Sequence, residues 1–215
     1  MARIIDLFPS EISEDRLMNI VTRRYETPSV RDVKFIEAIA KSCSEDGELN
    51  VQRLMDFDLK TILSYLKNSH SSYRRNRLPE IGHTIELMKR MKSDAVVLIS
   101  ILEKFFNDYS THLLDHLLDE DDILFPQVEA LIEANENDRD KPYINVDAFR
   151  HSHSDTESDL QKVREILRAY KPEIGKFSPY RILLTQLKTF ELDLHIHSRI
   201  EEEVLLTKIT SIVGC

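Results

Sequence analysis

The chain has 215 residues but only 4 glycines and 7 prolines, so turns are few and the segments between them are long. This length suits one domain with a short appendage and excludes a multi-domain machine. The formal net charge of -9 disfavours non-specific binding to nucleic acid, and no apolar run is long enough for a membrane span.

These proportions predict an all-α protein with two parts. Residues 1–55 are expected to form a small helical N-terminal domain, because their short apolar groups are interrupted by Pro28 and Gly47. Residues 56–215 show sustained helical periodicity and are expected to form an antiparallel up-down-up-down four-helix bundle. The four helices are predicted near residues 55–92, 95–136, 145–171 and 178–213.

The cysteine content and the first residues both bear on location. Only Cys43 and Cys215 occur, so one chain can build neither a disulfide framework nor a thiolate metal cage. The first residues soon become acidic and lack the apolar core of a secretory signal. We therefore expect a cytoplasmic protein.

The dipeptide Leu78–Pro79 predicts a kink or break in the first helix.

Helical phase directs at least one histidine of each predicted helix toward the bundle axis. The polar and aromatic residues on the inward stripes are, in chain order, His70, Tyr73, Phe105, Tyr109, His112, His116, Glu120, Phe149, His153, Thr156, Phe190, His197 and Glu201. His83, His151 and His195 fall outside these stripes.

Several inward imidazoles and two inward carboxylates need a compensating partner, because a buried ionisable group without one costs several kcal/mol. A metal would supply it. The alternative is that each histidine is separately a satisfied core residue or an exposed one, and convergence from four helices weighs against that alternative.

An internal repeat supports the metal hypothesis. His116–Glu120 and His197–Glu201 both have the spacing His-x-x-x-Glu, and they lie 81 residues apart. His70 and His153 precede them and lie 83 residues apart. Residues at i and i+4 share a helix face, so each half reads as a helix with one histidine followed by a helix with a His/Glu pair.

Two further candidates find no match in this repeat. Glu157 follows His153 at the same spacing, but Arg74 holds the corresponding place in the first half, which favours a solvated edge for Glu157. His112 corresponds to Asp193, so we expect it near the site or lining a channel, with a ligand role as the alternative.

Four imidazoles and two carboxylates without a thiolate suit a pair of first-row ions, iron best, with manganese or zinc as alternatives. Such a pair would carry an oxo or hydroxo bridge and leave positions open. Open positions on redox-active ions in an apolar pocket can bind O₂ or NO, pass electrons or release an iron. A hydrolase is less favoured, because no additional acid–base constellation is evident.

The segments HSSYRRNRLPEI from His70, DHLLDEDDILFP from Asp115, HSDTESDLQKV from His153 and IHSRIEEEVLL from Ile196 resemble the hemerythrin-like bundle of the iron-sulfur-cluster-repair di-iron proteins. The resemblance implies a non-haem di-iron centre and a role in restoring damaged iron-sulfur clusters under nitrosative or oxidative stress, with O₂ or NO bound at the irons. The ligands it implies are His70, His116, Glu120, His153, His197 and Glu201.

The N-terminal part departs from that family, which usually carries an adjacent cysteine pair where this chain reads YETPS, Tyr25 to Ser29. Cys43 does not replace the pair. A gas- or iron-sensing module without turnover is therefore the second hypothesis. A ferritin-like oxidase or peroxidase is the third, and the histidine-rich ligand set argues against it. Damaged iron-sulfur proteins are the expected protein partners.

Overall fold

The computed structural model describes residues 28–43, 49–91, 96–134, 144–149, 162–164 and 178–213, together with Met18, Tyr25 and Leu160. These residues are largely helical, which confirms the all-α prediction. The elements are α2 (Val30–Ser42), η2 (Val51–Leu54), α3 (Leu59–Ser72), η3 (Tyr73–Arg77), α4 (Leu78–Arg90), α5 (Val96–Asp119), η4 (Glu120–Leu124), α6 (Phe125–Glu133), α7 (Val146–Phe149), α10 (Ser178–Arg199), η5 (Ile200–Leu205) and α11 (Leu206–Val213).

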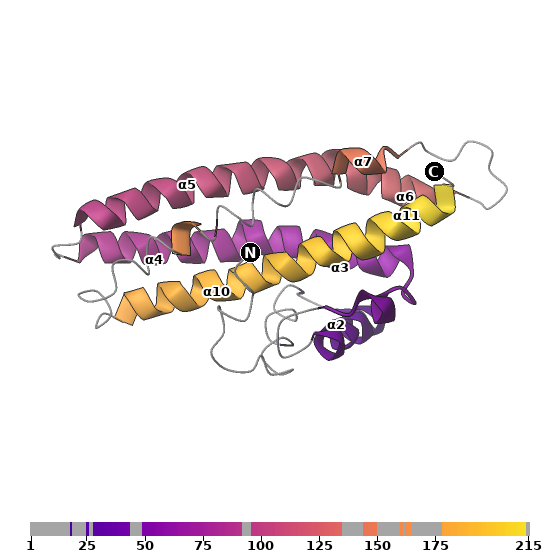
Figure 1. Ribbon diagram of the computed structural model, residues 1–215, viewed down its shortest axis with the longest axis horizontal. Coiled ribbons are helices and arrows are strands. Elements are labelled where there is room, and N and C mark those ends of the chain that lie inside the picture. The colour runs from indigo at the N-terminus through magenta and orange to yellow at the C-terminus, as the bar shows by residue number, and fades with distance from the viewer. Residues whose placement is uncertain are drawn as a thin grey trace.

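Three long rods dominate the structure and lie lengthwise against one another (Figure 1). They are α3–η3–α4, α5–η4–α6 and α10–η5–α11, and they correspond to three of the four predicted helices. The fourth prediction, near residues 145–171, falls mostly outside the described residues. Within it, α7, Leu160 and residues 162–164 are helical, and Leu160 and Val163 are buried.

Each rod contains a π-helical turn near its middle, namely η3, η4 and η5. The residue after each turn donates its N–H to the carbonyl oxygen five residues earlier: Leu78 to Tyr73, Phe125 to Glu120 and Leu206 to Glu201. Pro79 and Pro126 lie in the first turn of the α-helix that follows, where a missing N–H is tolerated. The interruption predicted at Leu78–Pro79 therefore takes the form of a π-helical turn within a continuous rod.

Side-chain capping fixes where the first two helices begin. The hydroxyl of Ser29 accepts from the Asp32 N–H, and the Asp32 carboxylate accepts from the Ser29 N–H, which forms a capping box for α2. Asp58 caps α3 by accepting from the Thr61 N–H at 2.7 Å. The Asp58 cap fixes the start of the rod that carries His70.

Two apolar clusters fill the interior, one toward each end of the rods. Leu66, Leu124 and Val204 belong to the first cluster, whereas Tyr73, Leu117 and Leu194 belong to the second. Along each rod, the predicted site residues fall where one cluster gives way to the other. The molecule thus places the buried His and Glu side chains of the predicted site in a layer between two apolar regions.

The N-terminal helix α2 packs its apolar face into the first of these clusters. Phe35, Ile36 and Ile39 are buried there, and the Phe35 ring makes edge contacts with Phe57 and Tyr65. The boundary predicted at residue 55 stays a prediction. Among the described residues, no helix is both long and apolar enough to cross a bilayer.

Helical phase was right for the first and last rods and wrong in part for the second. Phe105 is 46% exposed and His112 is also exposed, whereas Phe106 is 3% exposed and packs in the second cluster. The second rod therefore turns Phe106, Leu113 and Leu117 inward. Inward apolar residues can follow one another after three or four positions. Over a helix of 24 residues, the predicted inward face can therefore be wrong by one position.

Candidate metal centre

The three rods bring histidines to the same level of the bundle because each lies in the last turn before a π-helical turn. His70 lies in the last turn of α3, His116 in that of α5 and His197 in that of α10. Glu120 begins η4, and Glu201 is the second residue of η5. Each glutamate thus follows its histidine by four residues across the junction between α- and π-helix.

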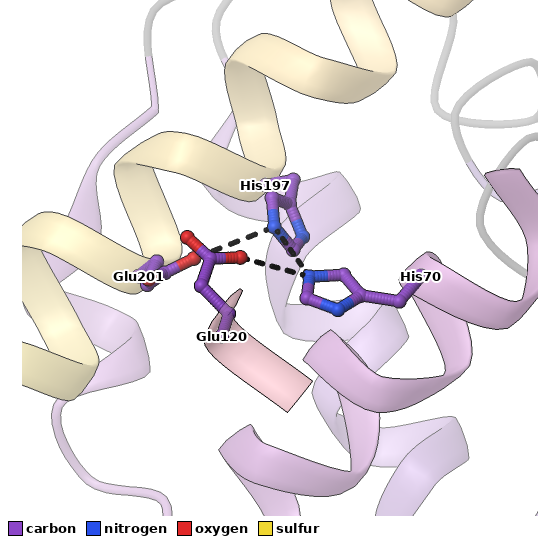
Figure 2. Close-up of side chains that lie close together, drawn as sticks. All are labelled: His70, Glu120, His197 and Glu201. Carbon is purple, nitrogen blue, oxygen red and sulfur yellow. Dashed lines mark hydrogen bonds and ion pairs between the residues drawn. The ribbon is translucent and has the colours of Figure 1, made fainter. Parts of the chain in front are cut away.

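Four of the predicted ligands form one compact group: His70, Glu120, His197 and Glu201 (Figure 2). Each contributes a nitrogen or oxygen that lies within 4.8 Å of the other three. Nε2 of His70 is 3.2 Å from Oε2 of Glu120 and 3.3 Å from Nε2 of His197. Nε2 of His197 is 3.4 Å from Oε2 of Glu201. The imidazoles and carboxylates therefore face a common point.

His116 joins the group through the second oxygen of Glu120. Its Nε2 lies 3.0 Å from Oε1 of Glu120, so this carboxylate directs one oxygen to His116 and the other to His70. The side chain of His116 is 12% exposed, against 1% for that of Glu120. His116 therefore lies at the edge of the buried layer.

The other histidines that the structure describes do not belong to this group. The sixth predicted ligand, His153, lies outside the described residues, as do His151 and Glu157. His83 and His112 are exposed and His195 is half-buried, so the expectation that His112 points toward the site is wrong. The four-residue group is the only candidate cation site of its kind in the part of the chain that the structure describes.

The electrostatics of the two buried histidines differ. Burial lowers the pKa of His70, but hydrogen bonds to Asp121 and Glu120 outweigh it and leave that pKa raised. Burial dominates at His197 and lowers its pKa to about 4, against the opposing effect of Glu201. His197 is therefore neutral near pH 7 and offers a lone pair to a cation.

Sequence reasoning missed the residues that surround these histidines. Asp121 accepts from Nδ1 of His70 at 2.9 Å, and Arg74 contacts the other oxygen of Asp121. The ring of Phe125 stacks on His70, and the ring of Tyr73 packs edge-on against His197. The successive acids after Glu120 were visible in the sequence, but nothing there indicated which one turns toward His70.

The donor set fits a first-row transition metal. Two imidazole nitrogens and two carboxylates, all nearly inaccessible to water, would leave charge uncompensated in a medium of low dielectric constant. Nitrogen and oxygen ligands bind such ions at about 2.0–2.2 Å, so donors that share one ion lie within roughly 4 Å of each other. The observed group is close to that size, and no cysteine belongs to it.

Comparison with characterised proteins gives distant but extensive matches. The chain is 21% identical over 164 residues to the iron-sulfur cluster repair protein ScdA of Staphylococcus haemolyticus, covering 76% of this chain and 72% of ScdA. It is 24% identical over 150 residues to the iron-sulfur cluster repair protein YtfE of Pectobacterium carotovorum, covering 70% of this chain and 65% of YtfE. No solved structure matches the chain significantly.

The family match covers most of the chain. The Hemerythrin HHE cation binding domain matches residues 61–209, a range that includes every predicted ligand, the whole second rod and most of the first and third rods. This match confirms the predicted four-helix bundle, since that is the fold of the family. With its buried His/Glu group and its similarity to cluster-repair proteins, the chain belongs to the hemerythrin HHE cation-binding family.

Proposed function

We propose that the protein holds a non-haem di-iron centre whose ligands are His70, His116, Glu120, His153, His197 and Glu201. The observation that carries the proposal is the convergence of His70, Glu120, His197 and Glu201 from three separate rods into one buried group. Glu120 directs its two oxygens to two histidines, as a carboxylate that bridges two ions would. His153 enters by its place in the internal repeat.

Iron is the metal that best suits these donors, with manganese or zinc as alternatives. Imidazole and carboxylate ligands without thiolate favour borderline first-row ions. An oxo or hydroxo bridge would complete the pair of ions. When bound, a pair of irons supplies redox chemistry and open positions for a small gas such as O₂ or NO.

The chain itself contributes orientation and exclusion of water. The π-helical turns set the glutamates at the level of the histidines, and the two apolar clusters close the layer from both ends. Phe125 and Tyr73 cover the rings of His70 and His197. Burial between apolar clusters and aromatic rings holds the ligand side chains in place and limits the access of water to them.

In the cell, we infer a role in iron-sulfur cluster repair or in the response to nitrosative or oxidative stress, with damaged iron-sulfur proteins as partners. The similarity to ScdA and YtfE, both named iron-sulfur cluster repair proteins, supports this role. The matched region spans 65% of YtfE, so repair by this chain is an inference from part of that protein's length. The cytoplasmic location stays a prediction.

A gas- or iron-sensing module without turnover is the second candidate. One observation favours it: the chain has only two cysteines, Cys43 and Cys215, and reads YETPS at the place where the resembling family usually carries an adjacent pair. A thiol-dependent step in repair would therefore lack its group. Under this alternative, the centre would bind its ligand without restoring a cluster in another protein.

Metal analysis and an optical spectrum, recorded before and after addition of NO, test the centre itself. We expect two irons per chain and a spectrum that changes with NO. Reactivation of a nitrosylated iron-sulfur enzyme by the purified protein then separates repair from sensing. Bound iron without reactivation favours the sensing module, whereas a protein that takes up no metal contradicts both.

A further inference from the structure

His70 is held at both ring nitrogens by consecutive residues of η4. Nε2 lies 3.2 Å from Oε2 of Glu120, and Nδ1 lies 2.9 Å from Oδ1 of Asp121. Both neighbours are carboxylates, but only Glu120 belongs to the compact His/Glu group. Asp121 therefore contacts the edge of the ring that points away from the proposed cation.

The surroundings leave this ring little freedom to turn. His70 is fully buried, and the ring of Phe125 stacks on it with centroids 4.9 Å apart and planes at 28°. Phe125 follows directly after the π-helical turn that carries both carboxylates. One short segment of the second rod thus contacts a face and two edges of the imidazole.

Asp121 is in turn fixed by a charged residue of the first rod. Nη1 of Arg74 lies 2.5 Å from Oδ2 of Asp121, so each oxygen of this carboxylate has its own partner. Arg74 follows His70 by four residues on the same rod. The three side chains therefore form a chain from Arg74 through Asp121 to His70.

We propose that Asp121, oriented by Arg74, is a positioning residue that accepts the Nδ1–H of His70 and thereby keeps Nε2 free to bind the cation. This inference rests on the proposed metal centre. A neutral imidazole carries one N–H, and the hydrogen bond at one nitrogen decides which nitrogen is left to bind metal. A carboxylate at that N–H also raises the basicity of the ligand and fixes its orientation.

The internal repeat explains why the sequence alone did not indicate this pair. The positions that match Arg74 and Asp121 in the second half are Glu157 and Glu202, so the basic partner is not repeated. At these two positions the sequences of the halves therefore differ, beyond the ligand pattern that they share.

Anaerobic titration of the metal-free full-length chain with Fe(II), in competition with a chelator, tests this role. We expect Asp121→Ala to weaken Fe(II) binding about 10–100-fold, the usual cost of losing such a partner. Asp122→Ala is the matched control, because it removes an exposed carboxylate from the same π-helical turn and should leave affinity unchanged. Asp121→Asn keeps an oxygen acceptor and should restore much of the affinity.

Arg74→Ala, with exposed Arg75→Ala as its control, gives a second test that leaves Asp121 in place should Asp121→Ala not fold. In the Zn(II)-loaded protein, NMR should show a slowly exchanging Nδ1–H of His70 that is lost in Asp121→Ala and weakened in Arg74→Ala. The positioning role would be overturned if Asp121→Ala and Arg74→Ala both bound Fe(II) as tightly as the unmodified protein and both kept its Nδ1–H signal. Failure of the unmodified protein to bind either metal would instead overturn the proposed centre.

Discussion

The two His-x-x-x-Glu segments share the same backbone conformation, a junction between an α-helix and a π-helical turn, but differ in their surroundings. In both, the histidine lies in the last turn of an α-helix and the glutamate lies in a π-helical turn, in η4 for the first segment and η5 for the second. The His197 side chain is 2% exposed, whereas that of His116 is 12% exposed. The second segment is thus enclosed, and the first lies nearer to solvent.

Their glutamates also have different neighbours. Glu120 contacts histidines of two rods, His70 and His116, and Glu201 contacts its own His197. The acid after Glu120 turns back to His70. The comparison indicates that sequence similarity between the halves preserves the ligand positions, while burial and second partners give each half its own properties.

The largest expected effect comes from the enclosed segment. His197→Ala or Glu201→Ala should weaken iron binding by more than about 100-fold, since even partners outside the ligand set cost 10–100-fold. The reason is that neither water nor another side chain can easily replace a ligand at a fully buried position. Iron content of the purified variants measures this, with half-buried His195→Ala as the control. Equal loss in the control would contradict the assignment.

Metal removal should destabilise the whole bundle, because the freed ligands stay buried between the two apolar clusters. At a free metal concentration roughly 100 times the dissociation constant, binding contributes about 2.7 kcal/mol. For a chain of this size that corresponds to a rise in melting temperature of roughly 5–10 °C. Thermal unfolding of the metal-free and loaded forms measures it. A metal-free form that melts no earlier would contradict the account.

The partly exposed segment should respond less than the enclosed one. His116→Ala should weaken iron binding on the order of 10-fold, the lower end of the usual range, because water can reach the vacated position. Competition titration with a chelator measures the change, and exposed His112→Ala is the matched control. If His116→Ala lost as much iron affinity as His197→Ala, the difference in burial between the two segments would not affect iron binding.

The smallest effect is expected outside both segments. Asp58→Ala removes the cap of α3 and should lower the free energy of unfolding by about 1 kcal/mol. Iron content should not change, since the cap lies three turns before His70 in the same helix. Denaturant unfolding and metal analysis of this variant, with exposed Asp56→Ala as the control, measure both quantities. Loss of iron in Asp58→Ala would contradict this prediction, because it would show that iron binding depends on the cap of α3.

Much of the fold followed from the sequence because its signals are local. The apolar stripes of the first and last rods predicted buried Ile62, Leu66, Leu187 and Phe190, and all four are buried. The phase is wrong in the second rod, where it predicts an inward Phe105 but Phe106 is the buried residue. Two adjacent phenylalanines offer the same hydrophobicity, and only the packing of the neighbouring rods decides between them.

The site followed in part for the same reason. The spacing of the residues and the internal repeat predict His70, Glu120, His197 and Glu201 as ligands, and these four side chains form one group in the structure. The Arg74–Asp121 contact joins residues 47 positions apart, so it depends on how two rods pack and leaves no periodic signal. The π-helical turns are not predicted from the sequence, because they resemble an α-helix in composition and differ only in a hydrogen bond that spans one more residue.

The most direct test of the central claim is Fe(II) reconstitution of the metal-free protein, followed by iron analysis of the intact chain and of His197→Ala. The account predicts two irons per chain in the unmodified protein and a marked loss in the variant. Iron uptake that is absent, or that is the same in both proteins, would contradict it.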